Sequence, residues 1–171
     1  MKIIGSVLVM IASSGIGFLY ASEVKKRIHE LEELRSLMKM ILGDIRYMRA
    51  TLYEAVKNAM RRHHGSFLEF LSKISESLSA SPGITLEDIW KQAVMSGLRN
   101  VSLNTEDKQK LIRFGERICS VERETIMACF EQYIEELGTE IKEVHNTVAS
   151  KVKLYRSMGV LTGIFIVVLL I

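Results

Sequence analysis

The sequence predicts an all-α protein, in which a water-facing antiparallel helical bundle is flanked by an apolar helix at each end. A single proline and 7% aromatic residues among 171 disfavour an all-β fold, which needs turn breakers and strand formers. Both ends are almost free of charge, because Met1–Ser22 contains only Lys2 and Ser157–Ile171 contains none. We therefore divide the chain into residues 1–22, a charged middle at 23–156, and residues 157–171.

The first apolar segment has the length of a transmembrane helix. Ile3–Ser22 is an uncharged run that spans about 30 Å as a helix, the thickness of a hydrocarbon core. A cleaved signal peptide is the alternative, and the single Lys2 and the bulky Leu19–Tyr20 junction argue against it. Ser13 and Gly17 belong to a stripe of small residues that would let another membrane helix approach closely.

The second apolar segment is shorter and ends the chain. Residues 157–171 would span about 22 Å as a helix, and about 27 Å if counted from Leu154 with Arg156 snorkelling to the headgroups. Gly159 and Gly163 form a GxxxG motif suited to helix packing in membranes. A C-terminal helix buried in a protein core remains the alternative.

Basic residues next to both apolar segments predict the orientation. They follow the first segment and precede the second: Lys25, Lys26, Arg27, Lys151, Lys153 and Arg156. The positive-inside rule then places the whole middle in the cytoplasm. In that reducing compartment Cys119 and Cys129, ten residues apart on one expected helix, are predicted to be free structural thiols.

The charged middle carries two long apolar stripes at helical spacing. The first consists of Leu31, Leu34, Met38, Ile41, Ile45, Met48 and Leu52. The second consists of Ile126, Phe130, Tyr133, Leu137, Ile141, Val144, Val148, Val152 and Tyr155. Stripes of this period are typical of helices that pack on other helices, so we expect two long helices side by side.

Shorter helices between the two stripes are indicated by capping signals. Thr51 with Glu54, and Thr85 with Asp88, have the spacing of a capping box. Another helical face begins near Ser66, and Asn104 or Thr105 is expected to cap a helix that carries Leu111 and Phe114. Ser120 is expected to cap the last long helix. The segments that begin at Thr51 and Thr85 resemble each other, through chance or through a duplicated helix start.

The sequence lacks motifs that would indicate an enzyme, a metal site or a cofactor. There is no phosphate-binding GxxxxGK[ST] loop, no GxSxG elbow and no zinc-binding spacing of His and Cys. His63 and His64 follow two arginines and are expected to form a solvated basic corner. A net charge of +3 is too small for a nucleic-acid binder. We expect no catalytic residue, cofactor, metal or small-molecule substrate.

Two residues of the middle have unusual positions. Gly115 lies inside a helical stretch, which indicates either close packing of another backbone or an unrecognised C-cap. Trp90, the single tryptophan, is expected to be a core residue, and a partner-binding anchor is the alternative.

Several of these features together carry a resemblance to a known family. The order is an apolar anchor, Ile45-Arg46-Tyr47, the start at Thr51, Trp90, Phe114-Gly115-Glu116, and a long helix into Leu154–Gly163. The whole chain resembles the stage III sporulation protein AB family of endospore-forming bacteria. The middle is also similar, more loosely, to the cytoplasmic helical domain of type II secretion F proteins.

The resemblance implies a non-enzymatic platform or adaptor in the channel between mother cell and forespore. It implies a place in the outer forespore membrane, with the bundle in the mother-cell cytoplasm. It also implies contact with a secretion-type ATPase, stage III sporulation protein AA, and with other membrane components of the channel. Such assignments by family are analogies.

Three functional hypotheses follow from the sequence: the adaptor, a self-associating membrane-anchored scaffold without an ATPase partner, and a small membrane enzyme. For the adaptor, we expect exposed charges to orient the partner. The expected contact residues are Arg46, Arg61, Arg62, Glu116, Glu122 and Arg123.

Overall fold

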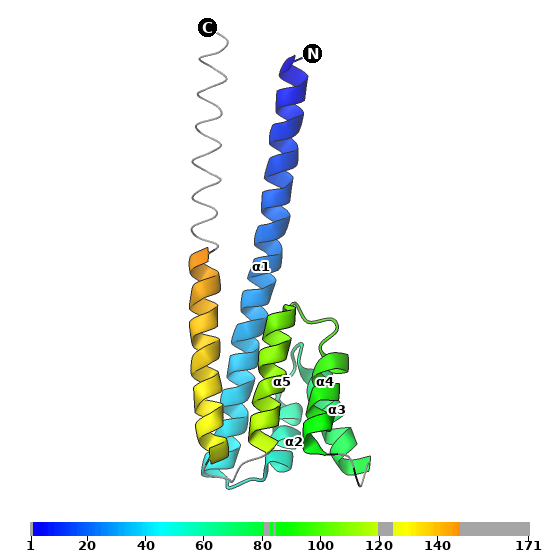
Figure 1. The fold of residues 1–171 in the computed structure, drawn as a ribbon, viewed down its shortest axis with the longest axis vertical. Helices are drawn as coiled ribbons and strands as arrows, with labels where there is room; N and C mark the ends of the chain where they lie inside the picture. The colour runs from blue at the N-terminus through cyan, green and yellow to red at the C-terminus, as the bar shows by residue number, and fades with distance from the viewer. Residues whose placement is uncertain (1, 81–82, 84, 120–124, 148–171) are drawn as a thin grey trace. The chain divides into compact units, whose positions relative to one another are not determined.

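The computed structural model describes residues 2–80, 83, 85–119 and 125–147, with the backbone alone at 2–21 and 79–80. Within that part of the chain there are helices and no strands (Figure 1). The helices are α1 (Lys2–Tyr47), α2 (Leu52–Arg62), α3 (Leu68–Ala80), α4 (Leu86–Gly97), α5 (Thr105–Cys119) and a further helix over 125–147. The predicted all-α class is confirmed.

The chain forms two compact units. One comprises His29–Thr139, with the C-terminal part of α1, all of α2 to α5 and the start of the 125–147 helix. The other comprises Met1–Ile28 and Glu140–Ile171. In this second unit Arg27 Nη2 donates to Glu140 Oε1 at 2.7 Å, so an ion pair joins its two helical segments.

Among the described residues, none of the helices is both long enough and apolar enough to cross a membrane. Residues 157–171, including Gly159 and Gly163, lie outside the described part of the chain. The side chains of Ser13 and Gly17 lie outside it as well. That residues 1–22 and 157–171 cross a membrane stays a prediction from the sequence.

In the His29–Thr139 unit, α1 and the 125–147 helix run antiparallel. Arg35 Nε donates to the carbonyl oxygen of Ile134 at 3.1 Å, and Arg46 pairs with Glu131. Between these two contacts the residue number rises along α1 and falls along the 125–147 helix, as it must for antiparallel helices. Gly138 lies beside the Arg35 guanidinium: a Cβ added to this glycine would lie 2.9 Å from Nη2, so a larger residue would displace the arginine head group.

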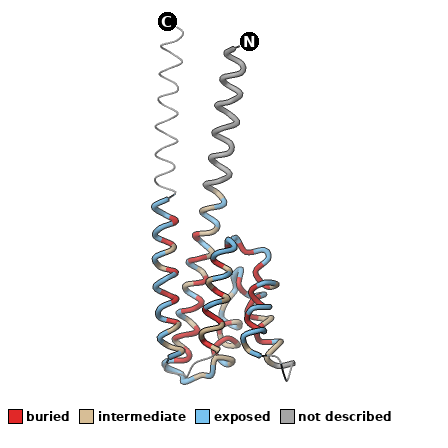
Figure 2. The backbone as a smooth tube through the Cα atoms, viewed as in Figure 1, coloured by how far each residue is buried: buried red, intermediate tan, exposed pale blue. Residues whose placement is uncertain are grey.

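Most described members of both predicted stripes are buried (Figure 2), whereas Leu52 and Ile126 are half-buried and Val148, Val152 and Tyr155 lie outside the described residues. The buried members are Leu31, Leu34, Met38, Ile41, Ile45, Phe130, Tyr133, Leu137, Ile141 and Val144. Met48 is 67% exposed, so its assignment to the stripe is wrong. The physical reason is that α1 ends at Tyr47, and the helical period no longer determines where the next side chain lies.

The predicted caps open their helices. The Thr51 hydroxyl accepts from Glu54 N, and the Glu54 carboxylate accepts from Thr51 N, which completes a capping box. The Thr85 hydroxyl accepts from Asp88 N. At α5 the cap is Asn104, whose side-chain oxygen accepts from Asp107 N at 2.7 Å. Ser120 lies outside the described residues.

The capping box at Thr51 predicts a measurable titration. Hydrogen bonds from the Thr51 backbone, and then from its hydroxyl, lower the pKa of Glu54 below its ordinary value of 4.5. Because the folded pKa is lowered, the box stabilises α2 fully above pH 4.5 and is lost as the pH falls through the lowered pKa. An NMR titration of Glu54 should give a midpoint below 4.5. Thr51→Val should raise it part of the way back, and an unchanged midpoint would contradict the role of the hydroxyl.

Trp90 is a core residue, as expected, since it is 1% exposed and its indole nitrogen donates to Leu111 O at 2.9 Å. Gly115 does pack closely, but against this indole rather than against another backbone. A Cβ at residue 115 would lie 2.0 Å from Trp90 Cδ1. The close approach of two backbones occurs instead at Gly97, where a Cβ would lie 2.8 Å from Phe70 Cα.

Candidate partner-binding surface

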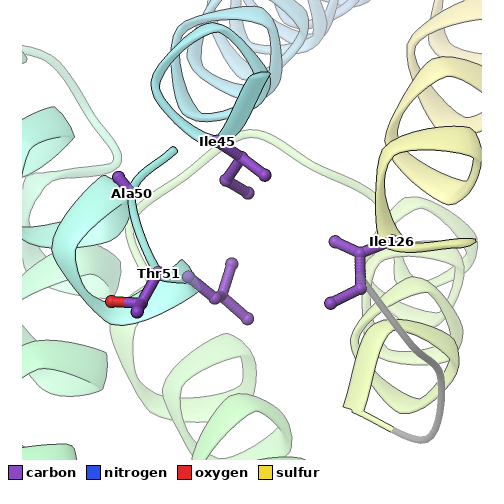
Figure 3. A pocket seen from close by; sticks show the side chains of 5 residues that line it. Ile45, Ala50, Thr51 and Ile126 are labelled. Atoms are coloured by element: carbon purple, nitrogen blue, oxygen red, sulfur yellow. The ribbon is translucent and has the colours of Figure 1, made fainter. Parts of the chain in front are cut away.

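A small apolar pocket opens at the end of the His29–Thr139 unit where α1 stops and α2 begins. Its volume is about 170 Å³. Figure 3 shows Ile45 of α1 and Ile126 of the 125–147 helix on different sides of this space. The lining residues are Ile45, Ala50, Thr51, Leu52 and Ile126. Because the Thr51 hydroxyl is engaged in the capping box, the pocket offers its occupant an apolar wall.

The local sequence explains why α1 stops at this point. Met48 N makes the last bond of regular helical spacing, to Asp44 O at 3.1 Å, and Ala50 N then turns back six residues to the same oxygen at 3.3 Å. Arg49 has a φ of 53°, in the left-handed region. Glycine usually takes such a position after a helix, because a Cβ is unfavourable there. The chain therefore turns at an arginine and enters the Thr51 cap directly.

Two large apolar side chains next to the pocket face the solvent. Tyr47 is 81% exposed and Met48 is 67% exposed. They precede the pocket residue Ala50 by only two or three positions. Exposed apolar groups that adjoin a pocket are typical of surfaces that bind another protein. We name Ile45, Tyr47, Met48, Leu52 and Ile126 the corner surface.

The charges around the corner surface are largely neutralised within the bundle. Glu131 pairs with Arg46 and raises the pKa of that guanidinium further above its ordinary range. Glu54 is held by Thr51. Arg49 is exposed, and within the described part of the chain no ion pair involves it. The one cation left without a carboxylate at the turn is thus Arg49, among the residues that the structure describes.

The predicted contact residues lie in different settings. Arg46 is beside the corner surface, Arg61 is exposed on α2, and Glu116 is half-buried on α5. Arg62 Nη2 contacts Asp44 Oδ2 at 2.5 Å, so its guanidinium already has a carboxylate partner in the fold. Glu122 and Arg123 lie outside the described residues. That these six residues contact a partner stays a prediction.

Sequence reasoning misses Tyr47, Arg49 and the pocket itself. Tyr47 enters the sequence argument only as part of the family pattern, and Met48 only as a core residue. One usable signal was the sequence Tyr47-Met48-Arg49-Ala50 between a long apolar stripe and a capped helix. Such a turn without glycine, proline or asparagine is unusual, because those residues favour turns.

The connection between α2 and α3 is fastened to α1 by polar groups. His63 Nε2 lies 2.8 Å from Glu33 Oε1, and Ser66 Oγ donates to Glu30 Oε1 at 3.1 Å. The His63 side chain is 11% exposed, so the expectation of a solvated corner is wrong for this residue. It holds for His64, which is exposed.

Within the described residues, no group of three His, Cys, Asp or Glu side chains is placed to hold a metal ion. Cys119 ends α5 and Cys129 lies on the 125–147 helix. Both are free thiols, as predicted, and both are half-buried, but they lie on two helices rather than on the one helix expected. We find no described constellation that would carry out catalysis, and the expectation that the chain is not an enzyme stays a prediction.

Cys119 is predicted to react slowly with alkylating agents. Burial, and next the negative charge of Glu87, raise the pKa of its thiol from 9.0 to about 11. The thiolate is the reactive form, and at pH 8 its fraction should be about a hundredfold lower than for a free thiol. A more basic thiolate is also more nucleophilic, so alkylation should be roughly tenfold slower overall. The rate should rise with pH toward about 11. Iodoacetamide labelling of a Cys129→Ser variant measures this, and labelling as fast as a model thiol would contradict it.

The fold and the corner surface define a class: small helical-bundle proteins with an apolar pocket and exposed apolar side chains at one end of the bundle. Comparisons with known proteins identify the family within this class. The family model for stage III sporulation protein AB matches residues 2–171. Stage III sporulation protein AB of Bacillus subtilis (strain 168) is 21% identical over 170 residues, which are 99% of each chain.

A solved structure of a stage III sporulation protein AB has the same fold. Its TM-score is 0.62 at 16% identity, and the match covers 72% of this chain and 97% of that one. Since the family model matches nearly every residue, the chain belongs to the stage III sporulation protein AB family. Membership implies a role in sporulation.

Proposed function

We propose that the chain is a non-enzymatic membrane platform of the channel between mother cell and forespore, and that it docks a cytoplasmic secretion-type ATPase. The corner surface is the observation that carries this proposal. It combines an apolar pocket with two exposed apolar side chains, Tyr47 and Met48, on a rigid helical support. Single exposed apolar residues are common on protein surfaces, but two of them beside an apolar pocket are typical of a binding surface.

The support of the corner surface suits the transmission of position or force. Its pocket is lined from α1 and from the 125–147 helix, which are the described helices nearest in sequence to the two apolar ends. A side-chain hydrogen bond at Arg35 and an ion pair at Arg46 join these helices. A partner bound at the corner surface would therefore act on both helices at once.

We further propose that residues 1–22 and 157–171 hold the chain in the outer forespore membrane, with the bundle in the mother-cell cytoplasm. The length of the first run supports a membrane span, and the flanking cations support the orientation. Single cysteines introduced beside each apolar end, labelled from either side of the membrane in intact cells, test it. Labelling of both flanks from the outside would overturn it.

Docking can be tested with the full chain in lipid nanodiscs and purified stage III sporulation protein AA. The wild-type chain should bind, and a Tyr47→Ser, Met48→Ser variant should bind less. The matched control is Leu68→Ser, Met95→Ser, which removes two other exposed apolar side chains, 43% and 62% exposed. Equal loss in both variants would show that the corner surface has no special role. Absence of wild-type binding would overturn ATPase docking.

The same preparation distinguishes the second hypothesis, a self-associating scaffold. The full chain without other components would then form a stable homo-oligomer in detergent or nanodiscs, and the Tyr47→Ser, Met48→Ser variant would dissociate it. A charge reversal at Glu116 and Arg123 tests the predicted polar contacts. Unchanged retention of the ATPase by that variant would remove both residues from the contact surface.

A further inference from the structure

We propose that Arg49 is a docking residue, and that the corner surface binds a protein segment presenting one large apolar side chain next to a carboxylate. The inference rests on the proposed function, because it specifies the chemistry of the partner at the same surface. Three independent observations carry it: the backbone at Arg49, the state of the surrounding charges, and the size and lining of the pocket.

The first observation is the conformation of Arg49. Its φ of 53° is the single positive value at a non-glycine residue in the described part of the chain. Glycine adopts the left-handed region without the steric cost that a Cβ brings. Glycine at this position would therefore suit the fold at least as well as arginine. An unfavourable residue at an exposed position indicates a function for its side chain.

The second observation is the balance of charge beside the pocket. Glu131 is paired with Arg46, and the Glu54 carboxylate accepts two hydrogen bonds from Thr51 at 2.8 and 2.9 Å. These two carboxylates are therefore committed within the fold, whereas Arg49 is exposed and outside every ion pair of the described residues. Among the residues that the structure describes, the unbalanced charge at this turn is positive, so electrostatic complementarity favours an acidic partner group.

The third observation concerns what the pocket can hold. It measures about 170 Å³ and its wall is aliphatic, from Ile45, Leu52 and Ile126 (Figure 3). This space suits one large apolar side chain, such as a leucine, methionine or phenylalanine. Ala50, which lines the pocket, directly follows Arg49 in the chain. An apolar anchor in the pocket and a carboxylate at Arg49 can therefore come from neighbouring residues of one partner segment.

Sporulation provides a test that does not depend on which protein the partner is. Four variants of the full chain replace the native copy in its own host: Arg49→Glu, Arg49→Gly, Ala50→Leu and the control Arg113→Glu. Arg113 is an exposed arginine on α5, so its reversal changes net charge equally. Counts of heat-resistant spores and amounts of membrane-associated chain are measured. Arg49→Glu and Ala50→Leu should lower spore counts strongly, while Arg113→Glu should not.

Arg49→Gly keeps the inference testable if the other variants fold poorly. Because glycine favours the left-handed region, the thermal unfolding midpoint of the Arg49→Gly variant should be equal to or higher than that of the wild type. A variant that is as stable as the wild type and yet forms fewer spores would show that the guanidinium is needed for binding. Normal spore counts with Arg49→Gly and with Arg49→Glu would overturn the inference.

Binding of the full chain in nanodiscs to purified stage III sporulation protein AA separates this inference from the proposed function. Arg49→Glu should weaken that binding by roughly tenfold, as expected for a like charge placed against a carboxylate. If wild type and Arg49→Glu bind equally, ATPase docking stands and the role of Arg49 is wrong. If the wild type does not bind but Arg49→Glu abolishes sporulation, ATPase docking is wrong and the acidic, apolar partner is another protein.

Discussion

Replacing Trp90 with alanine is expected to lower the free energy of unfolding by about 4 kcal/mol. Trp90 is one of the largest fully buried side chains of the described bundle, with 1% exposure. Its removal eliminates apolar contact with α3 and α5 and leaves a cavity that rigid helices cannot close. Since native proteins have a free energy of unfolding of only about 5–15 kcal/mol, this loss is a large fraction of the total.

The geometry around Trp90 explains why no neighbour can replace it. The indole contacts Phe70 and Phe114 edge to face, with ring centroids 5.3 and 5.8 Å apart. Phe114 in turn stacks on Tyr133 at 4.5 Å. Helices α3, α4, α5 and 125–147 thus meet in one aromatic chain. Burial of the Tyr133 ring also raises the pKa of its hydroxyl, which stays protonated and adds no charge to this core.

The measurement is a guanidinium titration of the full chain in mild detergent, followed by circular dichroism. Trp90→Phe serves as a comparison, since it keeps an aromatic ring but removes the hydrogen bond from the indole nitrogen to Leu111 O. It should lose less stability than Trp90→Ala. If alanine cost less than about 1 kcal/mol, Trp90 would not be a central packing residue, and its alternative role as a partner anchor would be reopened.

The parts of this fold that sequence predicts well are those governed by local rules. The stripe from Leu31 to Ile45 and the caps at Thr51, Thr85 and Asn104 each depend on residues close together in one helix. Helical period and hydroxyl or amide capping decide such features without reference to the rest of the chain. The sequence therefore places these features correctly.

Features that depend on where a helix stops, or on distant segments, cannot be obtained in this way. Met48 continues the apolar period of α1 in sequence, yet α1 ends at Tyr47, and Ala50 N turns back to Asp44 O. The pocket combines Ile45 with Ile126, which lies on another helix far along the chain. His63 is expected in solvent because the residues before it are basic, but its side chain is half-buried and lies against Glu33 on another helix.

The same limit applies to the candidate contacts. Arg62 has the pattern of an exposed charge on α2, but its guanidinium contacts the buried Asp44 carboxylate. Arg49 is overlooked because nothing in its residue type marks a left-handed conformation. A charged residue that is ion-paired within the fold and one that is not cannot be distinguished from the sequence. Only the arrangement of the carboxylates distinguishes them.

Gly115→Ala is expected to lower the free energy of unfolding by about 2 kcal/mol, although alanine is the better helix former. The added Cβ would lie 2.0 Å from Trp90 Cδ1 and 2.4 Å from Cγ, distances that no pair of non-bonded carbon atoms tolerates. The indole cannot retreat, because Phe70 and Phe114 enclose it and Leu111 O holds its nitrogen. Overpacking therefore outweighs the gain of about 1 kcal/mol in helix propensity.

A double-mutant cycle tests this explanation directly, with circular dichroism in all four proteins. In a Trp90→Leu background the smaller side chain leaves space at residue 115, so the clash is relieved and the helix propensity of alanine remains. Gly115→Ala should then be neutral or stabilising, which gives a coupling of about 2 kcal/mol or more between the two sites. If alanine destabilised the bundle equally in both backgrounds, the glycine would be required for another reason than contact with the indole.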